Sequence, residues 1–115
     1  MTTFLGRHSE PDDHIQQLRW LGHDVRIVSG GEDKESVLDA FATGLALPEW
    51  FGHNWDALLD ALRDLDPSRE APIELVWDHA GTLRARDREA YDTVVDVLEQ
   101  VADERDDLNV TVITR

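Results

Sequence analysis

The sequence predicts an α/β domain in which a small three-stranded parallel sheet is flanked by helices. Three short apolar runs, at residues 25–28, 73–77 and 110–113, have the composition of buried strands. Between them, apolar residues recur at intervals of three and four, which is typical of helices that bury one face. Strands that alternate with helices form a parallel sheet with right-handed crossovers, so the order of these elements indicates the class.

The first predicted helix covers residues 9–21. Pro11 stands near its start, acidic residues follow in its first turn, and Gly22 ends it. The first strand comes next and ends at a turn formed by Gly30 and Gly31.

Two helices are predicted in the middle of the chain, at residues 32–45 and 54–65. Asn54 is a good cap for the second helix, because its side chain can accept a hydrogen bond from an otherwise unpaired backbone amide. Apolar residues at helical spacing predict the buried face of each helix. These residues are Val37, Leu38, Phe41 and Leu45 in the first helix, and Trp55, Leu58, Leu59 and Leu62 in the second.

The longest predicted helix covers residues 87–105. It follows the second strand after a turn at 80–81, and it leads into the last strand. Acidic and amide side chains cover one side of this helix, so its other side is expected to pack on the sheet. That apolar side consists of Tyr91, Val94, Val95, Leu98, Val101 and Ala102.

Length and composition limit the possible classes of protein. A chain of 115 residues has the usual length of one domain, so we expect residues 1–115 to fold as one unit. The sequence has no cysteine, which excludes disulfides and cysteine-based metal sites. No apolar stretch resembles a signal peptide or a membrane span, so we expect a cytoplasmic protein.

The strongest compositional feature is the negative charge. The sequence has 25 acidic and 11 basic residues, for a formal net charge of −14. Nucleic acids and anionic membranes attract the opposite charge, so neither is expected as a partner. Solubility alone could explain the excess of acids, and so could a basic protein partner, whose association a complementary field would accelerate.

The most unusual segment is the bend and helix at residues 47–60. Trp50 and Phe51 stand on the bend, where large aromatic side chains are costly unless they pack or bind something. Asp56 and Asp60 are four residues apart and therefore share one face of the helix, away from its apolar side. Two like charges so placed repel each other mildly, and a cationic partner would offset that repulsion.

Three interpretations of this face remain open from the residues alone. It can be an ordinary solvated acidic surface, a metal or hydrolase site that uses His53 with Asp56 and Asp60, or a recognition face for a basic protein. Catalytic carboxylate pairs usually need a pocket that separates their pKa values, which two surface acids on one helix do not provide. The chain also lacks a glycine-rich phosphate loop, a nucleophile elbow and a helical two-histidine metal motif. No metal or cofactor is therefore expected.

Residues 45–62, with the sequence LALPEWFGHNWDALLDAL, closely resemble the barstar family, whose members are intracellular inhibitors of barnase-type ribonucleases. A weaker likeness extends from about Val25 to the C-terminus, so residues 1–22 look like an N-terminal extension, which we expect to be helical. The resemblance implies a barstar-like fold, with a small parallel sheet and an inhibitory surface formed by the second family helix and the loop before it.

The resemblance also implies roles for single residues. Asp60 would enter the ribonuclease active site and take the place of an RNA phosphate, and Asp56 would contact a basic side chain on the rim. Trp50 would pack against the catalytic histidine of the enzyme, and Asn54 would fix the face. Phe51 is expected to belong mostly to the core.

Two positions depart from the family pattern. Leu59 stands where the family has a tryptophan, and Gln100 aligns with a glutamate of the family's last helix. Asp96, Glu99 and Asp103 are candidates to supply the lost charge. The predicted ribonuclease-binding residues are therefore Trp50, Gly52, Asn54, Asp56, Leu59, Asp60 and Gln100.

The sequence thus predicts a monomeric, non-enzymatic inhibitor that forms a one-to-one complex with a basic microbial ribonuclease of the guanyl-specific type. The alternative is a regulatory interaction module that binds another basic protein without inhibiting it. Loss of RNA cleavage at an equimolar ratio would distinguish the two. An enzyme is the remote third possibility, and would need an activity that disappears on chelation.

Overall fold

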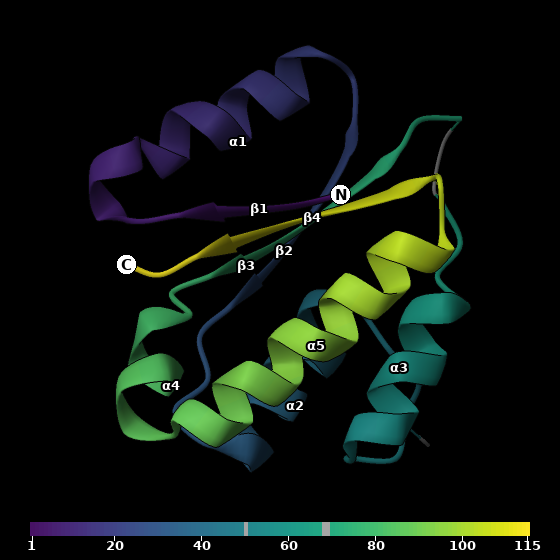
Figure 1. The fold of residues 1–115 in the computed structure, drawn as a ribbon. Helices are drawn as coiled ribbons and strands as arrows, with labels where there is room; N and C mark the ends of the chain where they lie inside the picture. The colour runs from purple at the N-terminus through teal and green to yellow at the C-terminus, as the bar shows by residue number, and fades with distance from the viewer. Residues whose placement is uncertain (50, 68–69) are drawn as a thin grey trace.

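The computed structural model describes residues 1–49, 51–67 and 70–115 (Figure 1). Its described strands are all parallel and form one sheet in the order β1-β4-β3-β2. They are β1 (Thr2–Leu5), β2 (Asp24–Ser29), β3 (Ile73–Asp78) and β4 (Leu108–Ile113). The helices are α1 (Pro11–Trp20), α2 (Lys34–Gly44), α3 (Trp55–Arg63), α4 (Gly81–Arg86) and α5 (Arg88–Glu104), and a short 3-10 helix, η1 (Arg7–Ser9), precedes α1.

The prediction of a parallel sheet flanked by helices is confirmed, but the prediction of three strands is wrong, because β1 adds a fourth. β1 pairs with β4, with Thr2 opposite Val110 and Leu5 opposite Ile113. The segment 1–22 that was expected to be helical therefore contains a strand as well as α1. Four residues are too few to show an alternating pattern, so pairing with β4 determines this strand rather than local sequence.

Helices cover both faces of the sheet (Figure 1). On one face α1 packs Ile15 and Leu18 against Val76 and Ile113. On the other face the larger core joins the sheet to α2, α3 and α5. All six residues of β3 are buried, as expected of a central strand covered on both sides.

Trp77 of β3 is the centre of the larger core. Its side chain is fully buried, and its ring centroid lies 6.0 Å from that of Phe41 on α2 and 5.7 Å from that of Tyr91 on α5. Its indole Nε1 donates a hydrogen bond to the Gly30 carbonyl oxygen over 3.2 Å. The only polar atom of this large side chain is thus paired, which burial requires.

The helical periodicity read from the sequence corresponds to burial in the structure. Val37, Leu38 and Phe41 of α2 are buried, as are Leu58 and Leu62 of α3. The other two residues predicted for the buried face of α3, Trp55 and Leu59, are only partly buried. The short helix α4 was expected to be only a turn. It buries Leu83 alone, so periodicity gave no signal for it.

Among the described residues, no helix combines the length and the apolar character needed to cross a membrane.

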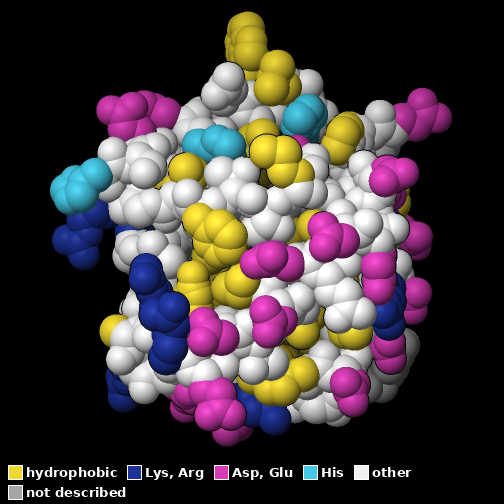
Figure 2. All heavy atoms as spheres, viewed as in Figure 1, with side chains coloured by type: hydrophobic (Ala, Val, Ile, Leu, Met, Phe, Trp, Pro, Cys, Tyr) yellow, Lys and Arg dark blue, Asp and Glu magenta, His cyan; other side chains and the backbone are white. Residues whose placement is uncertain are grey.

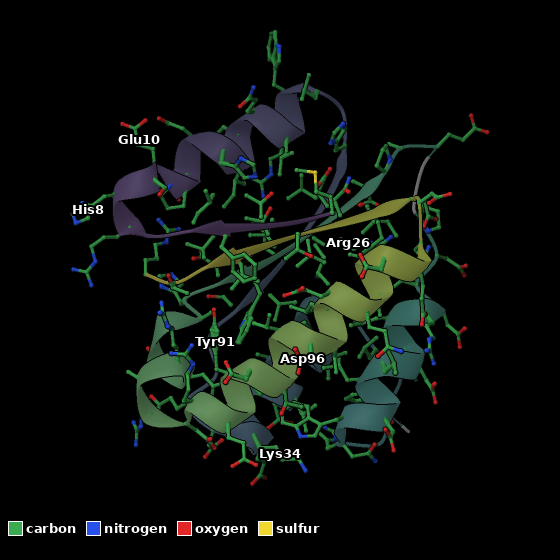
Figure 3. All side chains as sticks on the ribbon, viewed as in Figure 1. His8, Glu10, Arg26, Lys34, Tyr91 and Asp96 are labelled. Carbon is green, nitrogen blue, oxygen red and sulfur yellow. The ribbon has the colours of Figure 1, made fainter. Side chains whose placement is uncertain are left out.

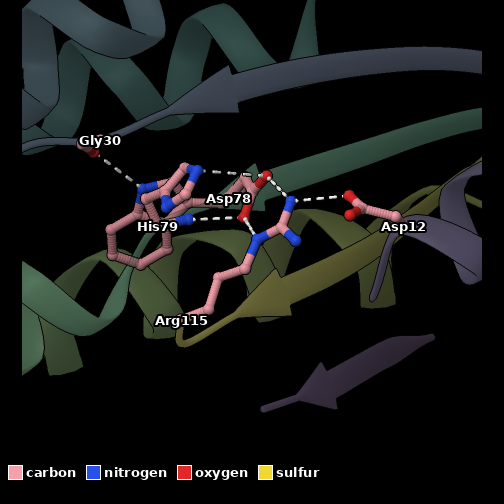
Figure 4. Close-up of polar contacts among 6 residues, drawn as sticks. Asp12, Gly30, Asp78, His79 and Arg115 are labelled. Atoms are coloured by element: carbon pink, nitrogen blue, oxygen red, sulfur yellow. Dashed lines mark hydrogen bonds and ion pairs between the residues drawn. The ribbon is translucent and has the colours of Figure 1, made fainter. Parts of the chain in front are cut away.

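An ion cluster lies beyond the carboxyl end of β3 (Figure 4). The buried Asp78 carboxylate accepts hydrogen bonds from Arg115 Nε at 2.9 Å and Arg115 Nη2 at 2.7 Å, and from the His79 backbone N–H at 2.8 Å. Arg115 Nη2 also donates to Asp12 Oδ1 on α1 at 2.9 Å. The cluster therefore joins the N-terminal and C-terminal segments of the chain to the centre of the sheet.

Candidate functional site

The loop between α2 and α3 is held in place by its own backbone and by one buried ring. The backbone N–H of Leu47 donates to the Ala42 carbonyl at 2.9 Å, and that of Phe51 donates to the Pro48 carbonyl at 2.9 Å. Phe51 is buried in the larger core, as expected. Trp50, the predicted aromatic anchor, lies outside the described residues.

Asn54 caps α3 as the sequence predicts. Its backbone is extended, and its Oδ1 atom accepts a hydrogen bond of 2.8 Å from the Ala57 backbone N–H. A Cβ atom on Gly52 would lie only 3.3 Å from Asn54 Nδ2 and 3.4 Å from Ala57 Cβ. A larger residue at position 52 would therefore crowd the Asn54 side chain that caps α3.

We expect Asn54→Ala to lower the free energy of unfolding by about 1 kcal/mol, because the substitution leaves a backbone amide of α3 without its partner. Urea denaturation followed by far-ultraviolet circular dichroism measures the change. Asn54→Asp, which keeps an acceptor oxygen at the cap, should lose much less. Equal losses in the two variants would contradict the capping role.

The two predicted carboxylates of α3 lie on its solvent side. Asp56 is exposed in the first turn, where the positive end of the helix dipole favours a negative charge. The Asp60 side chain is 75% exposed, one turn further on. Leu59 is partly buried and packs against the core, so it contributes less free surface than the two aspartates.

An ion-pair network joins Asp60 to α5. Arg63 Nη1 lies 3.8 Å from Asp60 Oδ1, and the Arg63 guanidinium donates two hydrogen bonds, of 2.7 and 2.8 Å, to the Glu104 carboxylate. Gln100 Nε2 donates to the same carboxylate at 3.2 Å. The predicted site residues on the two helices are thus connected through Arg63 and Glu104.

Arg63 and Glu104 were not among the predicted site residues, whereas Asp96, Glu99 and Asp103 were the candidates to supply the charge that Gln100 lacks. The spacing of Arg63 and Glu104 along their helices could have indicated both residues. Arg63 follows Asp60 by three positions and Glu104 follows Gln100 by four, and residues so spaced are neighbours on a helix surface. The contact between the two pairs depends on the packing of α3 against α5.

Hydrogen bonds from Arg63, and then from Gln100, lower the pKa of the Glu104 carboxyl to about 2. We expect Arg63→Met to raise that pKa toward the usual value for glutamate, because the two strongest donors to the charged form are lost. Side-chain carboxyl chemical shifts followed by NMR during an acid titration measure it. Arg88→Met, which breaks an i,i+4 pair with Asp92 elsewhere on α5, is the control and should leave Glu104 unchanged. An unchanged Glu104 in Arg63→Met would refute the network.

His53 does not join the α3 carboxylates. Its Nε2 atom pairs with Asp39 Oδ1 of α2 at 2.8 Å, and its ring lies 5.2 Å from the Phe51 ring. In the described part of the chain, no cluster of three or more histidine or carboxylate side chains is arranged to hold a metal ion. His53 is thus paired with α2 rather than grouped with Asp56 and Asp60, as the metal or hydrolase interpretation required.

A hollow of about 510 Å³ lies between the loop and α3, next to Asp60. Leu47, Phe51 and Leu65 contribute apolar lining, and Asp60 and Asp64 contribute carboxylates. Arg26 also lines the hollow, and its guanidinium is paired with Asp24 at 2.9 Å. An apolar wall beside carboxylates suits a long basic side chain, whose methylene groups pack while its charge stays paired. The candidate site is therefore an acidic helix face with an adjoining hollow.

Comparison with known proteins gives one family match. Residues 13–114 match the family described as Barstar (barnase inhibitor), so the match begins within the segment 1–22. No curated protein matches the chain significantly. The family match covers α2, the loop, α3 and α5, which together carry the acidic face. The chain belongs to the barstar family.

Proposed function

We propose that this protein is a cytoplasmic inhibitor that forms a one-to-one complex with a basic microbial ribonuclease of the guanyl-specific type. The observation that carries the proposal is the exposed Asp60 carboxylate, on the same helix face as Asp56 and beside a largely apolar hollow. Family membership supports the same conclusion. No catalytic step and no cofactor is needed for this function.

Asp60 acts as a substitute for an RNA phosphate. A ribonuclease active site binds phosphate through cationic side chains, and an arginine there can donate two parallel hydrogen bonds to one carboxylate. Asp60 is accessible to such a partner, because its side chain is 75% exposed and the one cation paired with it among the described residues, Arg63, lies 3.8 Å away. Substrate and inhibitor would then compete for one site.

The rigidity of α3 favours tight binding. The Asn54 cap fixes its start, Leu58 and Leu62 anchor its apolar face, and the Arg63–Glu104 pair joins its end to α5. A face that is already ordered loses little conformational entropy when the complex forms. The net charge of −14 adds long-range attraction to a basic enzyme, which accelerates encounter.

The direct test is titration of the purified protein into a guanyl-specific microbial ribonuclease, with the initial rate of RNA cleavage as the readout. We expect activity to fall to near zero at one molar equivalent. Sedimentation of the mixture should show a complex of one copy of each protein. Binding without loss of cleavage would favour the regulatory module, and failure to inhibit several such enzymes would overturn the proposal.

A further inference from the structure

β1 leaves one edge of the sheet open. Its partner β4 lies on one side only, and β1 is the outermost described strand. The Val110 N–H donates to the Met1 carbonyl at 3.0 Å, and the Thr114 N–H donates to the Leu5 carbonyl at 2.9 Å. In a parallel ladder alternate residues bond to the same neighbour, so the backbone groups of Thr2 and Phe4 point away from β4.

The face of β1 on the α5 side is only partly covered, although α5 contacts the strand. Leu5 packs with the α1 cluster, so by strand alternation Phe4 points to the opposite face. Phe4 is 52% exposed there, although parallel strands are normally covered on both faces. Phe4, Tyr91 and Val95 form the apolar part of a hollow of about 380 Å³ between β1 and α5.

The rim of this hollow is basic, in contrast to the acidic surface of the protein as a whole. Arg84 Cζ and Arg88 Cζ lie 5.9 and 5.7 Å from the centroid of the Tyr91 ring. Arg88 pairs with Asp92 at 3.0 Å, while no carboxylate of the described residues lies within ion-pair distance of Arg84. Figure 2 shows Lys and Arg side chains beside hydrophobic ones on this face, with Asp and Glu side chains next to them.

Tyr91 gives the hollow a polar group that is still available. Its side chain points from α5 toward the sheet (Figure 3), and the residue is only 6% exposed. Its hydroxyl makes no hydrogen bond with a described residue, and it is not a buried unpaired atom, so it reaches the solvent of the hollow. A ligand in the hollow can replace that solvent and bond to the hydroxyl.

We propose that an extended, acid-bearing segment of a partner protein docks here as a fifth strand against β1. Its backbone pairs with Thr2 and Phe4, an apolar side chain packs on Phe4 and Val95, and a carboxylate binds Arg84. This is recognition by strand addition, in which main-chain bonds give affinity and side-chain hollows give specificity.

Two features of the strand favour this occupant. The sequence Thr-Thr-Phe-Leu of β1 has no lysine or proline, the residues that commonly protect an exposed edge from pairing. The guanidinium of Arg84, which pairs with no carboxylate of the described residues, favours a negative charge, which the rest of this acidic surface would repel. A second copy of the chain is a poorer occupant, because it brings another net charge of −14 to the interface.

The test begins with selection of random dodecapeptides, displayed on phage, against the full chain. We expect selected peptides to alternate apolar residues and to carry at least one acid. Fluorescence anisotropy of the synthetic peptides should show at least tenfold weaker binding to the Arg84→Glu/Arg88→Glu variant. Replacing the acid of the peptide by lysine should restore binding to that variant.

Arg86→Glu is the matched control, because Arg86 belongs to the same segment but pairs with Glu32 at 3.3 Å and does not line the hollow. The Arg86→Glu variant should bind the selected peptides with the same affinity as the unsubstituted protein. Amide hydrogen exchange should slow at Thr2 and Phe4 when peptide is bound.

The proposal is overturned if no peptide is selected, if selected peptides show no acid preference, or if charge reversal has no effect. It is also overturned if sedimentation shows a dimer in which Thr2 and Phe4 are already protected. The hollow shares no residue with the acidic face of α3, so each of these results leaves the inhibitor proposal unaffected.

Discussion

Asp60→Ala is expected to weaken the complex with the ribonuclease by about 2–5 kcal/mol, which is roughly 30-fold to several thousand-fold in Kd. In the complex the carboxylate is desolvated against cationic groups of the enzyme. Its removal leaves those cations buried without a partner, and this penalty accounts for much of the loss. The same change in the free protein removes a side chain that is 75% exposed, so it should leave the stability almost unchanged.

Stopped-flow binding and inhibition of RNA cleavage both measure this effect. Asp13→Ala is the matched control, since it removes the same charge from α1, which covers the opposite face of the sheet. Asp60→Asn, which keeps the size but not the charge, should resemble Asp60→Ala. If Asp13→Ala weakened binding as much as Asp60→Ala does, only the overall negative field would matter, and the phosphate-substitute mechanism would be wrong.

The parts of the fold that sequence analysis predicted are those set by local patterns. Apolar runs gave β2, β3 and β4, and three- and four-residue spacing gave the buried faces of α2, α3 and α5. Asn54 was recognised as a cap because the chemistry of a helix start is confined to a few consecutive residues. The common face of Asp56 and Asp60 follows from helix geometry alone.

The missed elements depend on contacts between distant segments. β1 is a strand because β4, more than a hundred residues later in the chain, offers it a partner with Thr2 opposite Val110. The Arg63–Glu104 pair likewise spans 41 residues and exists because α3 packs on α5. Hydrophobic periodicity describes one helix or strand at a time, so it indicates neither contact between distant segments.

The carboxylates of the acidic face could therefore be predicted from the sequence, but the cation beside them could not. The sequence indicates Asp56 and Asp60, whereas the structure adds a cation, Arg63, within 3.8 Å of Asp60. Glu104 neutralises that cation through two hydrogen bonds, so the cluster of Asp60, Arg63 and Glu104 keeps a net negative charge. A basic enzyme thus still meets an attractive surface.

Arg115→Met is expected to lower the free energy of unfolding by about 3 kcal/mol at neutral pH, the lower end of the cost of breaking a buried ion pair, because the Arg115 side chain is 24% exposed. Burial alone would raise the pKa of the Asp78 carboxyl, but the Arg115 and His79 hydrogen bonds outweigh burial and hold it below its usual value. The substitution leaves the Asp78 charge buried with only the weaker His79 contact.

The pH dependence of this loss identifies its cause. In the parent protein the folded pKa of Asp78 is depressed, so its stabilising contribution is complete above the unfolded pKa near 4 and disappears as the pH falls through the folded pKa. Without Arg115 the folded pKa of Asp78 should instead lie above the unfolded value, so the buried charge destabilises the variant increasingly as pH rises.

Urea denaturation should therefore show a large difference in the free energy of unfolding between the unsubstituted protein and the variant at pH 7 and a small one at pH 3. Asp78→Asn in the Arg115→Met background removes the buried charge and should recover part of the loss at pH 7. A difference that stayed the same at both pH values would mean that Arg115 acts through packing rather than through its charge.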